Sequence, residues 1–212
     1  MLLSRRWVDD RAMAESEIHE HAAGITWVMS GEGLARASHA LVVDGRVWLV
    51  DPVDAPEPLA RAAALGEPAG VVQLLDRHAR DGAVIAQRLG VGLERLPSAV
   101  PGTPLEAISL VDVPKWREVA LWWPATRTLV VPEAVGTAAS FAVGDGAVGV
   151  HPVLRPFGVR RLRHFEPELL LVGHGPPVVG PEAAGALREA LGRSRSDLPR
   201  LVAKLPALVR GK

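Results

Sequence analysis

A cluster of charged residues follows a short apolar run in the first half of the chain. The stretch "LLDRHARDG" (74–82) contains Asp76, His78, Arg80 and Asp81. Histidine and carboxylate side chains at such close spacing are ligands for zinc, manganese or iron(II). Arg80 is unexpected among them, because a guanidinium donates hydrogen bonds, accepts none and keeps its positive charge. The stretch therefore indicates a metal site that is working, remodelled or lost.

Other candidate residues also stand at the ends of apolar runs. Asp51 ends the run 38–51, Glu133 follows "TLVVP" (128–132), and His174 lies in "LLLVGHG" (169–175). Short runs rich in Val and Leu and bounded by Gly, Pro or Asp are typical of buried strands. Loops from one edge of a sheet can converge on a site, so we expect Asp51, His78, Glu133 and His174 to meet at one rim.

The elements that must position these residues alternate along the chain. Strands are predicted at 24–31, 38–53, 70–75, 118–124, 128–133 and 169–175, and helices at 55–65, 81–90, 181–193 and 196–210. The Asp44-Gly45 pair predicts a type I′ hairpin turn inside the second run. Segment 91–117 has the least regular pattern. A mixed fold of strands and helices follows.

The order of these elements and motifs resembles that of the metallo-β-lactamase superfamily over residues 25–192. Three motifs of that family, His-x-His-x-Asp-His, a Gly-Asp turn and Gly-His-Gly, correspond to "DRHARD" (76–81), "PEAVG" (132–136) and "GHG" (173–175). The resemblance implies an α+β fold, a four-layer αββα sandwich, and the activity of a metal-dependent hydrolase. We expect residues 1–195 to form this domain.

The resemblance also shows where this chain departs from the family's ligand pattern. His78 and His174 match ligand histidines, and Glu133 stands in place of the bridging Asp. Elsewhere the match fails, because Asp76 and Asp81 replace histidines, Arg80 replaces the metal-binding Asp, and Pro114 replaces a further His near Glu118. The implied metal ligands are His78, His174, Asp76, Asp81 and Glu133. Of these, Asp81 and Glu133 are the implied catalytic groups.

Two interpretations of the altered motif stay open. A site for two dications needs about six or seven well-placed donors, and an inward-pointing Arg80 would repel one of them. The first interpretation is a single zinc, manganese or iron ion held by His78, His174 and carboxylates. The second is a site with no metal, in which Arg80 pairs with Asp81 or Glu133 and compensates the clustered carboxylates. We expect Arg80 to lie among Asp81, Glu133 and His174.

Several other residues are expected near the site or at the surface. Asp51 is expected to orient the metal loop, and His39, Glu118 and Trp116 to line the cleft. His19, His21, His151 and His164 are expected to be exposed or at the rim of a pocket. The tract "LRPFGVRRLRHF" (154–165) is expected to be a solvated face or, alternatively, to hold a small anionic substrate through its arginines.

Composition limits the classes of partner. The 24 basic and 24 acidic side chains cancel, so nucleic acid and anionic membranes are not expected as partners. Cysteine is absent, which excludes thiolate ligands and disulfides. No apolar run is long enough for a membrane span or a signal peptide, so a cytoplasmic protein is expected. The expected partner is a small, anionic molecule.

The carboxyl-terminal segment is predicted to be an amphipathic helix. In 196–210 the apolar residues recur at helical spacing. Because this segment lies beyond the core of the resembled family, residues 196–212 are expected to form an extension that packs on the domain or forms a homodimer contact.

Overall fold

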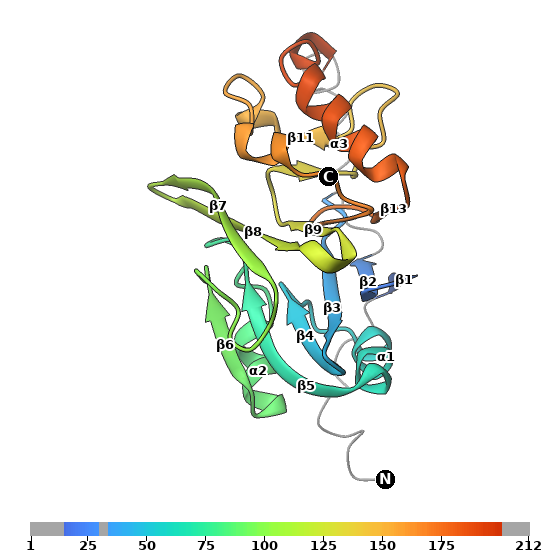
Figure 1. Cartoon of the computed structure of the whole chain (residues 1–212), viewed down its shortest axis with the longest axis vertical. Coiled ribbons are helices and arrows are strands. Elements are labelled where there is room, and N and C mark those ends of the chain that lie inside the picture. The colour runs from blue at the N-terminus through green and yellow to red at the C-terminus, as the bar shows by residue number, and fades with distance from the viewer. Residues whose placement is uncertain (1–14, 30–33, 201–212) are drawn as a thin grey trace.

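The computed structural model describes residues 15–29 and 34–200, and it forms four layers. Two sheets face each other in the middle, with helices on both outer sides (Figure 1). The α+β class and the αββα sandwich expected from the sequence are confirmed. The four layers matter for function because the loops at one edge of the two sheets carry the candidate residues.

The first sheet has six strands in sequence order. They are β1 (Ser16–His21), β2 (Gly24–Met29), β3 (Ala37–Val43), β4 (Arg46–Val50), β5 (Glu67–Gln73) and β6 (Gly92–Arg95). The first four are antiparallel to one another, whereas β5 runs parallel to both β4 and β6. Parallel neighbours need a crossover connection, and α1 (Pro56–Leu65) and α2 (Gly82–Leu89) provide the two crossovers.

The second sheet has five strands in the order β13-β12-β9-β8-β7. They are β7 (Glu106–Val113), β8 (Trp116–Trp123), β9 (Thr128–Val131), β12 (Leu169–Val172) and β13 (Val178–Val179). A small ladder pairs β10 (Val135–Gly136) with β11 (Gly149–Val150), and α3 (Glu182–Arg193) covers the outer face. Short 3₁₀ turns η2 (Pro124–Thr126), η3 (Pro152–Leu154) and η4 (Arg160–His164) connect the elements.

Alternating side chains build three apolar layers. In β4, Val47 and Leu49 pack toward α1 and α2, whereas Trp48 and Val50 pack between the sheets. In β12, Leu171 lies between the sheets and Leu170 faces α3. Successive residues of a strand point to opposite faces, so strands that are apolar throughout can serve two layers at once.

Element boundaries differ from the sequence prediction in three places. The segment 91–117 contains β6 and the long edge strand β7, which the pattern did not indicate. The first strand of the sheet, β1, was also missed, and it places His21 partly inside the protein. These strands carry many polar residues because each lies at a sheet edge. The turn at Asp44-Gly45 is confirmed, with φ values of 49° and 75°.

The remaining predictions concern the carboxyl terminus and membranes. The predicted helix 196–210 lies mostly outside the described residues, which end at Arg200. In the described part of the chain, no helix has the length and apolar character that crossing a membrane requires.

Candidate metal centre

The ends of four strands from the two sheets meet at one cluster of side chains. His78 follows β5, Glu133 follows β9, and His174 follows β12. The Nε2 atoms of His78 and His174 lie 3.1 and 3.0 Å from the same carboxylate oxygen, Oε2 of Glu133. Asp51, at the end of β4, contacts His78 from behind. The convergence at one rim that the sequence predicts is therefore confirmed.

Both imidazoles are held by a hydrogen bond on the ring nitrogen that faces away from Glu133. His78 Nδ1 donates to Oδ2 of Asp51 at 3.0 Å, and His174 Nδ1 donates to the carbonyl oxygen of Leu34 at 2.8 Å. Carboxylate and carbonyl oxygens only accept, so each Nδ1 carries the hydrogen. In a neutral ring the Nε2 lone pair then points at Glu133. Donation by the rear nitrogen to a carboxylate or carbonyl is the usual arrangement of metal-binding histidines.

Asp51 is itself held in place by burial and by a second hydrogen bond. It is 3% exposed, and its other carboxylate oxygen accepts a hydrogen bond from the Leu74 amide at 3.0 Å. Burial and the nearby Arg80 lower the pKa of His78, but the Asp51 and Glu133 carboxylates outweigh them, so the pKa of His78 is raised overall. Asp51 therefore lies where its carboxylate can orient the His78 ring.

Glu118 determines where Glu133 lies. Its Oε1 accepts hydrogen bonds from the amides of Glu133 and Ala134 at 3.1 and 2.7 Å, and its Oε2 accepts one from Trp116 Nε1 at 3.0 Å. Burial raises the pKa of the Glu118 carboxyl. Glu118 therefore supports the turn after β9 from beneath, instead of lining a cleft.

His151 belongs to the cluster, although the sequence suggested a surface or rim position. Its Nε2 lies 3.3 Å from Oε1 of Glu133, and its Nδ1 accepts from the Val153 amide at 3.2 Å. The neutral ring therefore donates from Nε2 to Glu133, which makes His151 a hydrogen-bond donor and not a metal ligand. A signal was present, because His151 directly follows the apolar run that forms β11.

The pKa of Glu133 reflects its three imidazole neighbours. Burial would raise the pKa of this carboxyl, but hydrogen bonds from His151, His174 and His78 outweigh burial and hold the pKa well below its usual range. Glu133 is therefore a carboxylate at neutral pH, with Oε2 toward two histidines and Oε1 toward the third.

Two residues that the resemblance implied as ligands lie outside the cluster. Asp76 accepts a hydrogen bond from the Arg117 amide at 2.9 Å and thus joins β5 to β8. Asp81 accepts one from the Asp54 amide at 2.8 Å and holds the loop before α1 against the start of α2. Each carboxylate replaces a histidine of the family pattern and satisfies a main-chain donor instead.

Arg80 also differs from its expected position. Instead of pairing with Asp81 or Glu133, its guanidinium donates to the main-chain carbonyls of Ala37, Asp51 and Gly173, the last two at 2.8 and 3.1 Å. It therefore joins the ends of β3, β4 and β12 beneath the cluster. Arg80 and Asp51 both have positive φ, 37° and 43°, a conformation uncommon in residues other than glycine.

His39 and Trp116 were both expected to line the cleft, and they lie in different surroundings from each other. His39 is buried, and its Nδ1 lies 2.8 Å from Oγ1 of Thr26, which in turn lies 3.0 Å from Nε2 of His21. This buried polar chain lies within the first sheet, so His39 does not belong to the cluster. Trp116 does reach the cluster, because its ring contacts His151 edge-on at 4.8 Å.

The residues present do not fit two metal ions, but they fit one. Of the implied ligands, Asp76 and Asp81 are engaged elsewhere, and Arg80 adds a cation beneath the site. Among described residues, the ligand atoms of His78, Glu133 and His174 lie within 4.8 Å of one another. Tetrahedral zinc ligands are separated by about 3.4 Å, so this triad suits a single ion with a fourth position left open.

Comparisons with known proteins find similarity in structure and not in sequence. No family model matches the sequence, and no curated protein matches it either. Solved structures do match, among them DIM-1 metallo-β-lactamase, with a TM-score of 0.59, 13% identity, and coverage of 85% of this chain and 98% of that chain.

Two further solved structures agree with this result. The 1–254 fragment of the diflavin flavoprotein A 5 from Nostoc sp. PCC 7120, described as putative, has a TM-score of 0.60, 12% identity, and coverage of 87% of this chain and 97% of that chain. A metallo-β-lactamase from Pontibacter korlensis has a TM-score of 0.54, 14% identity, and coverage of 84% and 99%. The chain thus has the fold of the metallo-β-lactamase superfamily.

Proposed function

We propose that His78, Glu133 and His174 hold one divalent metal ion, zinc, manganese or iron(II), in a hydrolase that acts on a small anionic substrate. The observation that carries the proposal is the orientation of the two imidazoles. Both rear nitrogens donate to fixed acceptors, so in the neutral rings the Nε2 lone pairs of His78 and His174 face the same carboxylate oxygen of Glu133, at 3.1 and 3.0 Å. Three acceptors so close together need a positive charge between them.

The protein side chains have distinct parts in this proposal. Glu133 Oε2 would be a ligand, while Oε1 receives the hydrogen bond of His151 and keeps the carboxylate in place. A bound metal ion would supply Lewis-acid activation of water and of the substrate's carbonyl or phosphoryl oxygen. The position of Asp81 does not support a catalytic part for it, and none is proposed.

The anionic character of the substrate is inferred from the rim of the site. The guanidinium of Arg77, an exposed residue, lies 4.5 Å above the ring of Trp116, which also contacts His151. Arg77 Nη1 also donates to the carbonyl of Lys115 at 2.8 Å. A cation held over an aromatic face beside the cluster is suited to a carboxylate or phosphate group.

Metal analysis of the untagged protein, purified without chelators, tests the proposal. We expect about one equivalent of metal, and zinc titration should show binding that Glu133→Gln and His174→Ala each reduce at least ~100-fold. Asp76→Asn is the matched control, because Asp76 lies in the same motif but outside the cluster, and it should bind metal like the parent. Two tightly bound equivalents would contradict the single-ion proposal.

A second candidate has its own supporting observation. The raised pKa of His78 and the lowered pKa of Glu133 describe imidazolium–carboxylate pairs that satisfy the cluster without metal. The protein would then be a binding protein with no hydrolase activity. A parent protein that takes up no zinc, manganese or iron and keeps its stability in chelator would favour this candidate.

A further inference from the structure

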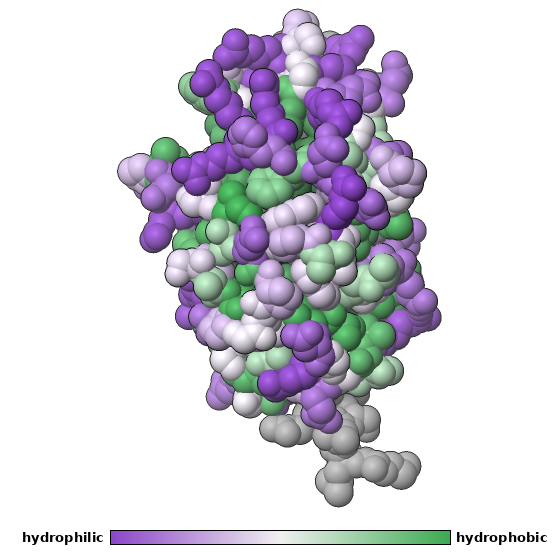
Figure 2. Space-filling model, viewed as in Figure 1, coloured by the Kyte–Doolittle hydropathy of each residue, from purple (hydrophilic) through white to green (hydrophobic). Residues whose placement is uncertain are grey.

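A basic cavity of about 600 Å³ lies between η4 and the carboxyl-terminal end of α3, away from the His–Glu cluster. Its lining includes Arg155, Arg160, Arg163, His164 and Arg195. No carboxylate is among the residues that line it in the described part of the chain. Figure 2 shows hydrophilic residues gathered at the end of the molecule formed by α3, η3 and η4.

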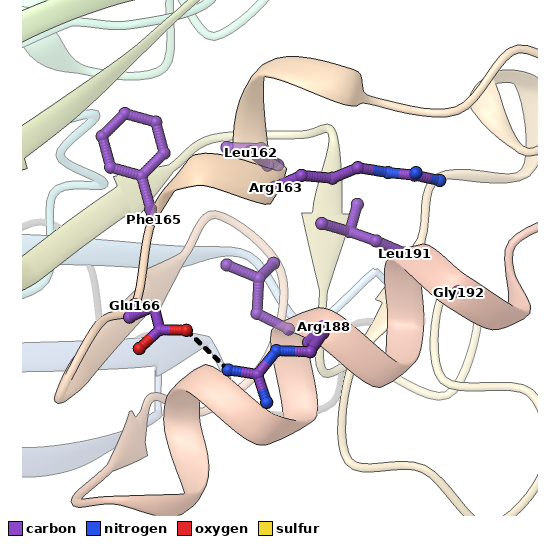
Figure 3. A pocket seen from close by; sticks show the side chains of 8 residues that line it. Leu162, Arg163, Phe165, Glu166, Arg188, Leu191 and Gly192 are labelled. Atoms are coloured by element: carbon purple, nitrogen blue, oxygen red, sulfur yellow. Dashed lines mark hydrogen bonds and ion pairs between the residues drawn. The ribbon is translucent and has the colours of Figure 1, made fainter.

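No carboxylate of the described residues neutralises Arg160, Arg163 or Arg195, the outer arginines of this cavity. Among described residues, neither Arg160 nor Arg163 forms an ion pair, and Arg195 donates only to the Pro156 carbonyl, at 3.1 Å. The nearby carboxylate of Glu166 is engaged by Arg188 at 2.7 Å. Figure 3 shows the neighbouring pocket, which is lined by Glu166 and Arg188 and shares Arg163 and Leu191 with the basic cavity; in it the side chain of Arg163 extends past Leu191, away from the Glu166–Arg188 pair.

Arg155 lies at the inner wall of the cavity and is fully buried. One guanidinium nitrogen donates to the Phe141 carbonyl, and Nη1 lies 3.5 Å from Oδ2 of Asp197. Asp197 is also shared with Arg193 and Arg200, at 3.8 and 3.3 Å. The Nε atom of Arg155 has no hydrogen-bond acceptor in the structure, and Nη1 has only the long ion pair with Asp197, so this buried cation keeps an unsatisfied donor.

We propose that this cavity binds a small organic phosphate. Arginine guanidinium groups match phosphate oxygens with two parallel hydrogen bonds, and several arginines facing one void suit a ligand with more than one negative charge. The volume lies within the range of small-molecule sites. Phe157, 72% exposed, lines the same cavity and offers an aromatic face to a planar ring of the ligand.

The cavity is separate from the candidate metal centre but is connected to it by one residue. The main chain of Phe141 accepts the hydrogen bond of Arg155, while its ring stacks on His174 at 5.3 Å and contacts His151 at 5.5 Å. The proposed phosphate site does not depend on metal at the cluster, because none of its lining residues is a candidate ligand.

Calorimetric titration of the full chain with pyrophosphate and with AMP, at constant ionic strength, tests the proposal. We expect saturable binding with one site, and the double variant Arg160→Gln/Arg163→Gln should weaken it about tenfold or more. The matched control is Arg161→Gln/Arg188→Gln. It also removes two positive charges, one from η4 and one from α3, but at residues that do not line the cavity. It should weaken binding less than about twofold. Tighter binding of AMP than of pyrophosphate would indicate that the adenine ring of AMP stacks on Phe157.

Three outcomes would overturn the proposal. The first is that neither pyrophosphate nor AMP binds. The second is that both double variants weaken binding equally, which would indicate general attraction to a basic surface. The third is cavity-dependent binding of duplex DNA or anionic vesicles without binding of the small phosphates. Circular dichroism of each variant verifies that the fold is retained.

Discussion

At the residue scale, the orientation of each side chain in the cluster is set by a hydrogen-bond partner on the side away from the cluster. The Asp51 carboxylate and the Leu34 carbonyl select the tautomers of His78 and His174, and Glu118 determines where Glu133 lies. Such supporting groups control both the orientation and the basicity of metal-binding side chains.

Asp51→Asn tests the tautomer argument. An asparagine at this position can offer its amide NH₂ to His78 Nδ1, which would shift the ring hydrogen to Nε2 and remove the lone pair from the site. We expect zinc affinity to fall about 10- to 100-fold with the fold retained. The measurement is a zinc titration of parent and variant, and equal affinities would show that Asp51 does not set the tautomer.

Arg80→Ala tests whether Arg80 stabilises the fold. Three main-chain carbonyls, of Ala37, Asp51 and Gly173, would lose a charged donor beneath the cluster. We expect the free energy of unfolding to fall by about 3 kcal/mol in urea titrations, because buried acceptors are left unsatisfied. The exposed Arg77 of the same motif is the control, and Arg77→Ala should change stability by less than about 1 kcal/mol.

At the element scale, the cluster depends on how closely the end of β12 approaches β9. A Cβ atom on Gly173 would lie 2.1 Å from the Pro132 carbonyl oxygen, so only glycine fits where the strand delivers His174. The small β10–β11 ladder places His151 in the same way, because the amide of His151 donates to the Ala134 carbonyl at 2.9 Å, next to Glu133.

Gly173→Ala should therefore push β12 away from β9. We expect a loss of stability of about 3 kcal/mol or more, together with weaker metal binding. Gly185→Ala is the matched control, because a Cβ at Gly185 in α3 meets nothing within 4 Å. That change should stabilise the protein by about 0.5–1 kcal/mol in the same urea titration, since alanine favours a helix. Similar destabilisation by both variants would refute the close-approach argument.

At the scale of the whole molecule, the two sheets meet at the candidate centre, and the basic cavity lies beside the layer of α3. Buried histidines of the first sheet add a dependence on pH that is independent of either site. Burial, and then the neighbouring His19, lower the pKa of His21 to about 4, and burial also lowers the pKa of His39.

Acid should destabilise the protein through these histidines. His21 titrates at 6.5 when unfolded and at about 4 when folded, so the unfolded state binds more protons between these values. The stabilisation is complete above pH 6.5 and decreases as the pH falls toward 4, by up to about 3 kcal/mol from His21. In urea unfolding at several pH values, the free energy of unfolding should change less steeply with pH for His21→Gln than for the parent. Equal slopes would contradict the assignment.

The architecture and part of the candidate site could be predicted from the sequence and its resemblance to a known family. The sandwich was implied by the resemblance of the motif order to a known family, whereas the polar residues at strand ends are local signals, and they predicted the meeting of Asp51, His78, Glu133 and His174. Polar edge strands such as β1 and β7 were not predicted because they lack a continuous apolar pattern.

Which residues of "DRHARD" face the candidate centre depends on contacts that form only in the folded chain. Asp76 and Asp81 satisfy main-chain amides of other elements, and Arg80 satisfies three carbonyls, none of which is close in sequence. His151 entered the cluster through a ladder of two short strands. Side-chain direction at strand ends depends on φ and on the nearest unpaired main-chain group, and neither can be read from residue spacing.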